Sequence, residues 1–247
     1  MTWTSTGSYL LILQRKLLGI YNPKTENVSQ LEVGRHVSFQ AVADSHVAFG
    51  CRNGNLIIMH IDTQVKTSVS KHKSAIVCGA WTNTMDMFVS AALDHSFSIS
   101  NTNNETVVQI ESIGDAPRLL KWVNIDNSFE LGVASLDSIT LHSGLFESSA
   151  KKPLVLKFSD TYGQIVDYAS AGTNSGIMVV GFSHGWLISV YITSKSDKIG
   201  RQAFQVKSFE SEMHSLQVNI ALDMVVTCGD NLIKIHNLQN LQVHIFD

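Results

Sequence analysis

The chain has 247 residues, of which 44% are hydrophobic and 16% are charged, so it can fill the core of one all-β domain or of two smaller ones. Its 18 Lys and Arg residues stand against 21 Asp and Glu residues, and no run of basic residues is longer than two. No surface that follows phosphates is visible, so nucleic acid is not expected as a partner.

The three cysteines, Cys51, Cys78 and Cys228, are odd in number and far apart in the sequence. This pattern suits reduced thiols in a cytosolic compartment better than a disulfide framework. The longest N-terminal apolar run, residues 9–13, is too short for a signal segment, and no later stretch has the length of a membrane span. We therefore expect a soluble chain without direct membrane insertion.

An eight-residue pattern recurs along the chain: a turn residue, two small or polar positions, apolar-x-apolar, an aromatic-like position and a polar end. The clearest copies are residues 94–101 and 230–237. All six copies end near residues 22, 60, 101, 143, 191 and 237, so the steps between them are 38, 41, 42, 48 and 46 residues. Roughly 40–45 residues per four-stranded unit is typical of a WD-repeat β-propeller, whose blades cannot bury their apolar faces alone.

The first unit opens at Trp3, where a second strand is about to begin, so we expect this unit to be incomplete. Residues 3–6 and 81–84 share the pattern Trp-Thr-x-Thr, and Trp122 follows Trp81 by 41 residues, which supports one register for all units. In the unit that ends at Asn101, short apolar runs predict strands at 76–81, 87–91, 97–100 and 106–110, with a tight turn at 94–96.

Two later units are longer than the rest, with gaps near residues 144–153 and 193–200. Insertions in propellers form loops on one face, so these two loops are candidate binding elements. The chain stops at residues 246–247, within an expected fourth strand. We predict an all-β fold: a single WD-repeat β-propeller domain over residues 1–247, with about six blades of an incomplete seven-bladed ring.

His72 precedes the first strand of the best-defined unit, Ser90 lies on its second strand and Asp94 in the turn that follows. In WD repeats, residues of these types at these places form a buried hydrogen-bonded set. The usual fourth member, a Trp on the third strand, is replaced here by Ser100, so we expect an incomplete network. A buried polar set must be satisfied, and we therefore predict a structural role for His72 and no catalytic one.

Residues 181–185 match G-x-S-x-G, the nucleophile elbow of α/β-hydrolases. An elbow needs a helix after it, so that Ser183 would stand exposed at a sharp turn. Residues 186–191 instead have the pattern of a strand, and the repeat register places the motif at a turn between the second and third strands. A hydrolase is therefore not expected.

Metal and cofactor signals are also weak. The ten histidines are spread out, the closest pair being His236 and His244, and neither C-x-x-C nor H-E-x-x-H occurs. Gly50 and Gly54 precede an apolar strand pattern and no helix start, so they do not form a phosphate loop. We expect no catalytic, cofactor-binding or metal-binding residues, and no cofactor.

Individual residues carry a closer resemblance across almost the whole chain, most specifically the stretch 227–231 (Thr-Cys-Gly-Asp-Asn). The other matching residues are Lys71, His72, Ile76, Cys78, Gly79, Trp81, Gly163, Ile165, Val166, Tyr168, Ile177, Met178, Gly181, Phe182, Ser183, Gly185, Gly200, Phe204, Gln205, Ile233, Lys234, Ile235 and Leu238. In these residues the chain resembles the first propeller of the WD repeat-containing protein 19 family, WD-repeat subunits of intraflagellar transport complex A.

The resemblance implies a non-catalytic scaffold of complex A that acts in retrograde ciliary transport, cilium assembly and delivery of membrane proteins to cilia. The implied partners are the other complex A subunits and ciliary cargo proteins, and the implied location is the cilium, the ciliary base and the cytoplasm or cytoskeleton. Family members have two N-terminal propellers and a helical solenoid. The alternative is a generic WD-repeat adaptor of another complex such as a vesicle coat, because propellers share one architecture across unrelated functions.

Overall fold

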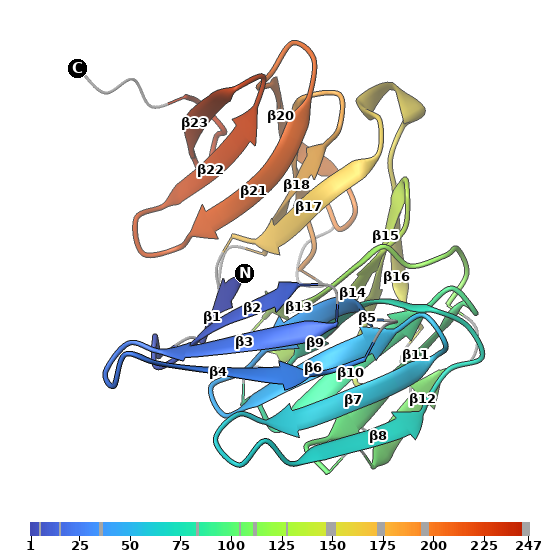
Figure 1. Ribbon diagram of the computed structural model, residues 1–247. Helices are drawn as coiled ribbons and strands as arrows, with labels where there is room; N and C mark the ends of the chain where they lie inside the picture. Colours follow the sequence, from blue (N-terminus) through green and yellow to red (C-terminus); the bar gives the residue numbers. More distant parts are fainter. Residues whose placement is uncertain are drawn as a thin grey trace. The chain divides into compact units, whose positions relative to one another are not determined.

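The computed structural model describes residues 1–4, 6–14, 16–34, 37–82, 84–103, 105–110, 113–126, 128–146, 152–171, 176–193 and 198–243. These residues form antiparallel sheets of consecutive strands (Figure 1). The chain separates into two compact units, residues 1–120 and 121–247. Over the described ranges, no helix is long and apolar enough to cross a membrane.

The first unit holds three four-stranded sheets. The first sheet contains β1 (Thr2–Trp3), β2 (Leu10–Gln14), β3 (Leu17–Asn22) and β4 (Asn27–Glu32). The second contains β5 (Val37–Val42), β6 (His46–Cys51), β7 (Asn55–His60) and β8 (Lys66–Ser70). The third contains β9 (Ile76–Trp81), β10 (Met87–Ala92), β11 (Ser96–Asn101) and β12 (Thr106–Ile110).

The second unit holds three further sheets, and its boundary with the first falls within β13. One sheet contains β13 (Leu119–Ile125), β14 (Ser128–Ala134), β15 (Ser138–His142) and β16 (Leu154–Lys157). The next follows a short 3-10 turn, η1 (Asp160–Tyr162), and contains β17 (Ile165–Ser170), β18 (Ile177–Phe182), β19 (Trp186–Tyr191) and β20 (Gln202–Lys207). The last contains β21 (Met213–Asn219), β22 (Met224–Gly229) and β23 (Leu232–Asn237).

The predicted register of the repeat is confirmed. The third strands of five sheets end at the predicted residues 22, 60, 101, 191 and 237, and β15 ends at His142, one residue before the predicted position. The predicted strands 76–81 and 106–110 match β9 and β12, whereas Ser96, predicted to lie in a turn, already belongs to β11. The single domain over 1–247 and the incomplete ring stay predictions, and residues 246–247 lie outside the described ranges.

The prediction that the first repeat is incomplete is wrong for the described strands, because the sheet of that repeat has four strands, β1 to β4. Thr2 and Trp3 form a short first strand that pairs with Leu11 and Leu10. The Thr4 amide donates to the Tyr9 carbonyl (3.0 Å), as the Thr82 amide donates to the Met87 carbonyl (2.9 Å). Each Trp-Thr-x-Thr stretch therefore ends a first strand and closes the turn into the second.

Burial differs between the strands of a sheet and explains the apolar patterns. The second strands β6, β10 and β18 are buried over almost their whole length, whereas the fourth strands β8 and β20 are mostly exposed. A strand covered on both faces needs a continuous apolar run, and one covered on a single face needs alternation. Phe49 in the first unit and Val179 in the second belong to separate apolar clusters.

Glycines at two of the tight turns allow close backbone contact between neighbouring sheets. Gly54 has a φ of +83°, and a Cβ there would lie 2.1 Å from the His72 carbonyl oxygen. Gly185 has a φ of +78°, and a Cβ there would lie 2.1 Å from the Phe209 carbonyl oxygen. Only glycine tolerates this conformation together with such close backbone approach, so both turns dock onto the chain that leads into the next sheet.

Candidate functional site

His72 is the centre of a buried hydrogen-bonded set in the first unit. Its Nε2 lies 2.9 Å from the Ser90 hydroxyl, and its Nδ1 lies 2.7 Å from the Ser96 hydroxyl. The Ser96 hydroxyl in turn donates to the Asp94 carboxylate (2.6 Å). Because the Ser96 proton goes to Asp94, His72 must donate to Ser96 from Nδ1; in the neutral ring Nε2 then accepts the Ser90 proton.

The electrostatics of the set agree with a neutral histidine. Burial lowers the pKa of His72, and the nearby Asp94 carboxylate only partly offsets that effect. Burial alone would raise the pKa of Asp94, but the Ser96 hydroxyl and the Lys73 amide outweigh it, so the pKa of Asp94 is lowered. The Asp94 oxygen is 3.6 Å from His72 Nδ1, and Ser96 links the two.

The sequence prediction placed His72, Ser90 and Asp94 in one set, and the structure brings all three together, with Ser96 as the unpredicted link. Ser100 lies on β11 in the same sheet, but its buried hydroxyl has no hydrogen-bond partner among the described residues. The fully buried Ser98 hydroxyl on the same strand is also without a partner there. The hydrogen bonds of His72 thus connect the turn at Asp94 to Ser90 in the interior of the sheet.

A second buried set lies in the last sheet, and sequence reasoning missed it. His236 on β23 is fully buried, with Nε2 3.0 Å from the Ser208 hydroxyl and 3.2 Å from the Thr227 hydroxyl. Its Nδ1 lies 3.0 Å from the Leu241 carbonyl oxygen, which can only accept, so Nδ1 donates here as well.

The signal for this set was present in the spacing. Ser208 precedes Asp230 by 22 residues, as His72 precedes Asp94, and His236 follows Asp230 by six, as Ser100 follows Asp94. The second-strand residues also correspond: Ser90 pairs with Ser98 across β10 and β11, and Thr227 pairs with Lys234 across β22 and β23. The histidine and the serine have exchanged places between the two sheets.

Ser183 lies in the turn between β18 and β19, as predicted. A strand follows this turn, whereas a nucleophile elbow is followed by a helix. Its hydroxyl accepts from the Gln164 amide at 2.9 Å. The adjacent His184 directs Nδ1 to the Thr161 carbonyl oxygen, 3.3 Å away, and not to Ser183. The glycines of the motif serve close packing, as Gly185 shows, so nothing in this geometry prepares Ser183 for attack.

The thiols are unpaired, with Cys51 and Cys78 buried and Cys228 half-buried. Burial raises the pKa of Cys78 to about 12, so that thiol stays protonated. Across the described ranges, no three His, Cys, Asp or Glu side chains gather in a group that could hold a metal ion. Of the two predicted binding loops, residues 147–151 and 194–197 lie outside the described ranges.

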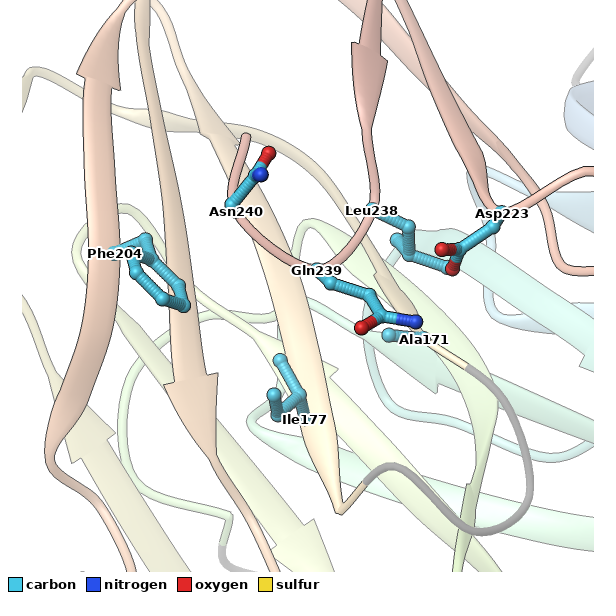
Figure 2. A pocket seen from close by; sticks show the side chains of 7 residues that line it. All are labelled: Ala171, Ile177, Phe204, Asp223, Leu238, Gln239 and Asn240. Carbon is cyan, nitrogen blue, oxygen red and sulfur yellow. The ribbon is translucent and has the colours of Figure 1, made fainter. Parts of the chain in front are cut away.

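Two surface hollows lie between neighbouring sheets, one in each unit. The hollow of the second unit has a volume of about 540 Å³ and is lined by residues that Figure 2 shows as sticks, among them Phe204, Asp223 and Gln239. The hollow of the first unit measures about 350 Å³, and Tyr9 and Asp62 are among the residues that line it.

Comparison with known proteins agrees with this fold and these repeats. A model of the family described as the WDR19 first beta-propeller matches residues 1–245. WD repeat-containing protein 19 from Mus musculus and from Homo sapiens are each 28% identical over 254 residues, covering 98% of this chain. WD repeat-containing protein dyf-2 from Caenorhabditis elegans is 22% identical, also over 98% of the chain. The chain spans 18% of the length of each relative.

Solved structures support the architecture alone, because their sequence identities are low. The crystal structure of Sqt1 from Saccharomyces cerevisiae matches with a TM-score of 0.80 at 14% identity, covering 98% of this chain and 71% of that one. A chain of the crystal structure of the mitotic checkpoint complex matches with a TM-score of 0.72 at 13% identity, covering 100% of this chain and 74% of that one. Six antiparallel sheets, the repeat register and the family match together show that this chain belongs to the family of WDR19 first β-propellers.

Proposed function

We propose that the chain is a protein-interaction scaffold of intraflagellar transport complex A, acting in retrograde ciliary transport, in cilium assembly and in the delivery of membrane proteins to cilia. The observation that carries the proposal is the family match over residues 1–245, together with relatives named WD repeat-containing protein 19 in two mammals. The proposed partners are other complex A subunits and ciliary cargo proteins, and the proposed location is the cilium, its base and the cytoplasm or cytoskeleton.

The geometry supports a scaffold because the polar residues are used for structure. His72, Asp94 and His236 have hydrogen-bond partners inside the protein. Members of the WD-repeat propeller family are generally non-catalytic scaffolds, and function in such folds depends on exposed loops and inter-blade surfaces.

The test follows the protein that contains this chain, tagged at its natural expression level in ciliated cells. We expect it to concentrate at ciliary bases and along axonemes, and its loss should make material accumulate at ciliary tips because return transport fails. A tagged protein that stays on vesicle coats, with normal ciliary tips after its loss, would contradict the proposal and support the generic adaptor.

A further inference from the structure

The hollow of the second unit lies where two sheets meet. Ile177 on β18 and Phe204 on β20 line it from one sheet, and Asp223 and Gln239 line it from turns of the other. In Figure 2 the Phe204 ring lies on one side of Gln239, and the Asp223 carboxylate lies on the other, beside Leu238. The site is thus an apolar wall with a single charged group among its lining residues.

Two polar side chains of this hollow are not used in contacts within the protein, whereas the Asn240 side chain accepts from the Gln242 amide at 3.0 Å. Within the described ranges, the side chains of Asp223 and Gln239 make no hydrogen bond or ion pair with another residue. The Phe204 side chain is 44% exposed. The turn that leads into Asp223 also exposes Ile220 (56%) and Leu222 (62%), so apolar surface continues beyond the hollow.

The hollow of the first unit occupies the same place in the repeat. The Ile61 amide donates to the Ser45 carbonyl at 2.8 Å, as the Leu238 amide donates to the Asp223 carbonyl at 2.9 Å. The pairing of the third strand with the fourth agrees. Ile20 and Ser189 each lie two residues before the end of a third strand, and they pair with Ser29 and Phe204. Asp223 therefore corresponds to Ser45, Phe204 to Ser29, and Gln239 to Asp62.

Two side-chain hydrogen bonds join residues that line the first hollow. The Tyr9 hydroxyl donates to the Asp62 carboxylate, and the Gln64 side-chain amide donates to the Ser29 hydroxyl at 3.4 Å. The second hollow has Phe204 in place of Ser29 and Gln239 in place of Asp62, so neither bridge can form. One position of the repeat is thus bridged by side chains in the first unit and left without these bridges in the second.

We propose that the hollow of the second unit binds an extended segment of a partner protein that places an apolar side chain beside a Lys or Arg. A volume of about 540 Å³ admits one or two side chains and not a folded domain. The apolar side chain would pack on Phe204 and Ile177, and the basic side chain would donate to Asp223, the only carboxylate among the described lining residues. The inference rests on the proposed scaffold function and specifies the chemistry of one partner.

The test presents the full chain to a display library of random peptides of about 12 residues and sequences the bound pool. We expect enrichment of peptides in which an apolar residue neighbours Lys or Arg. Asp223→Asn removes the charge and keeps a residue that tolerates the φ of +54° found there. Phe204→Ser installs the residue that stands at position 29, and Asp62→Asn in the hollow of the first unit is the matched control.

Enriched peptides are then synthesised with Leu-Arg or Leu-Glu at their centre, and binding is measured by fluorescence polarisation. Asp223→Asn should weaken binding of the Leu-Arg peptide about fivefold, because a partly exposed charge-assisted hydrogen bond is lost. It should leave the Leu-Glu peptide unchanged, and Asp62→Asn should bind both peptides like the wild type. Cooperative thermal unfolding of each variant checks folding, and Asp223→Asn keeps the test valid if Phe204→Ser does not fold.

Three results would overturn the inference: no enriched motif, binding that survives both hollow variants, or self-association of the chain that Phe204→Ser abolishes. The last would make a second copy the occupant. None of them bears on the ciliary location or the tip accumulation expected above, so failure of this inference is distinguishable from failure of the proposed function.

Discussion

The sheet β9–β12 and the sheet β21–β23 both bury a histidine, but they take it from different places in the repeat. His72 comes from the segment before the first strand, and His236 from the third strand. In each case Nδ1 donates, to Ser96 or to the Leu241 carbonyl, and Nε2 lies beside a second-strand hydroxyl. In these two sheets the buried interior holds one imidazole among hydroxyls, and the histidine comes from either of two positions of the repeat.

The surface shows the opposite behaviour. At the equivalent inter-sheet positions the first unit is bridged by Tyr9 with Asp62, whereas the second exposes Phe204 and Asp223. The exchange of histidine and serine keeps the buried sets of the two sheets equivalent, whereas the residues at the equivalent surface positions differ. We therefore expect specific function of this chain to depend on its surface.

Removal of either histidine should have the largest effect on stability. His72→Ala and His236→Ala each remove buried hydrogen bonds and leave a cavity, so each should lower the free energy of unfolding by roughly 2–4 kcal/mol. His214→Ala is the control, because that side chain is 63% exposed, and it should cost less than about 0.5 kcal/mol. Denaturant unfolding measures all three, and a cost for one buried histidine no greater than for His214 would break the comparison.

Substitution of the turn aspartates, Asp94 and Asp230, should cost different amounts of stability in the two sheets. Asp94 accepts from the Ser96 hydroxyl as well as from the Lys73 amide, so Asp94→Ala should cost about 1–2 kcal/mol. Asp230 accepts from the amides of Ser211 and Glu212, and Asp230→Ala should cost less. Lys73→Ala retains the amide and should be near neutral. Equal shifts of the denaturant midpoint for Asp94→Ala and Lys73→Ala would contradict the assigned role.

Moving the histidine tests whether its place is exchangeable. His72→Ser combined with Ser100→His gives the sheet β9–β12 the arrangement seen around His236. The double variant should be more stable than the sum of the single variants predicts, by about 1 kcal/mol, because Ser90 regains an imidazole partner. A double-mutant cycle in denaturant measures the coupling energy, and strict additivity would show that the two positions are not equivalent.

The lowered pKa of His72 predicts a pH dependence with a definite sign. The unfolded state takes up a proton as the pH falls below about 6.5, whereas the folded state resists protonation, so stability decreases below that pH until the folded pKa is also passed. Burial also lowers the pKa of His46 and His142, so the wild type carries three such contributions. In His72→Gln the loss of stability between about pH 7 and about pH 5 should be smaller. An unchanged slope of stability against pH would show that His72 does not contribute to this pH dependence.

Ser183→Ala should have the smallest effect, below about 1 kcal/mol, because one partly exposed hydrogen bond to the Gln164 amide is lost. A fluorophosphonate probe should leave Ser183 unlabelled, since no base activates its hydroxyl. Covalent labelling at this residue, detected by peptide mass spectrometry, would revive the hydrolase interpretation.

The parts of this molecule that could be predicted from sequence are local. The turn aspartates and apolar alternation around Asp94 and Asp230 fix the third strands, because those signals lie within a few residues. The two-residue strand β1 has no periodicity, and for that reason it was missed. Ser96 was assigned to the turn, although its hydroxyl links His72 to Asp94 in the folded sheet.

The two features that needed the structure are built from distant residues. His236, Thr227 and Ser208 meet only when β22 and β23 pack against the segment before β21. The hollow of the second unit combines Phe204 with Asp223 from an adjacent sheet, and Asp223 belongs to no recognisable motif. Side chains of this kind are unremarkable in the sequence, and the repeat register alone connects them.

The central claim, that this propeller belongs to a complex A scaffold, is tested most directly by quantitative co-purification. The tagged protein that contains this chain is isolated from ciliated cells, and the stoichiometry of the associated proteins is measured by mass spectrometry. We predict that the other complex A subunits are recovered in near-equal amounts. Recovery of coat or other complexes without complex A subunits would contradict the claim.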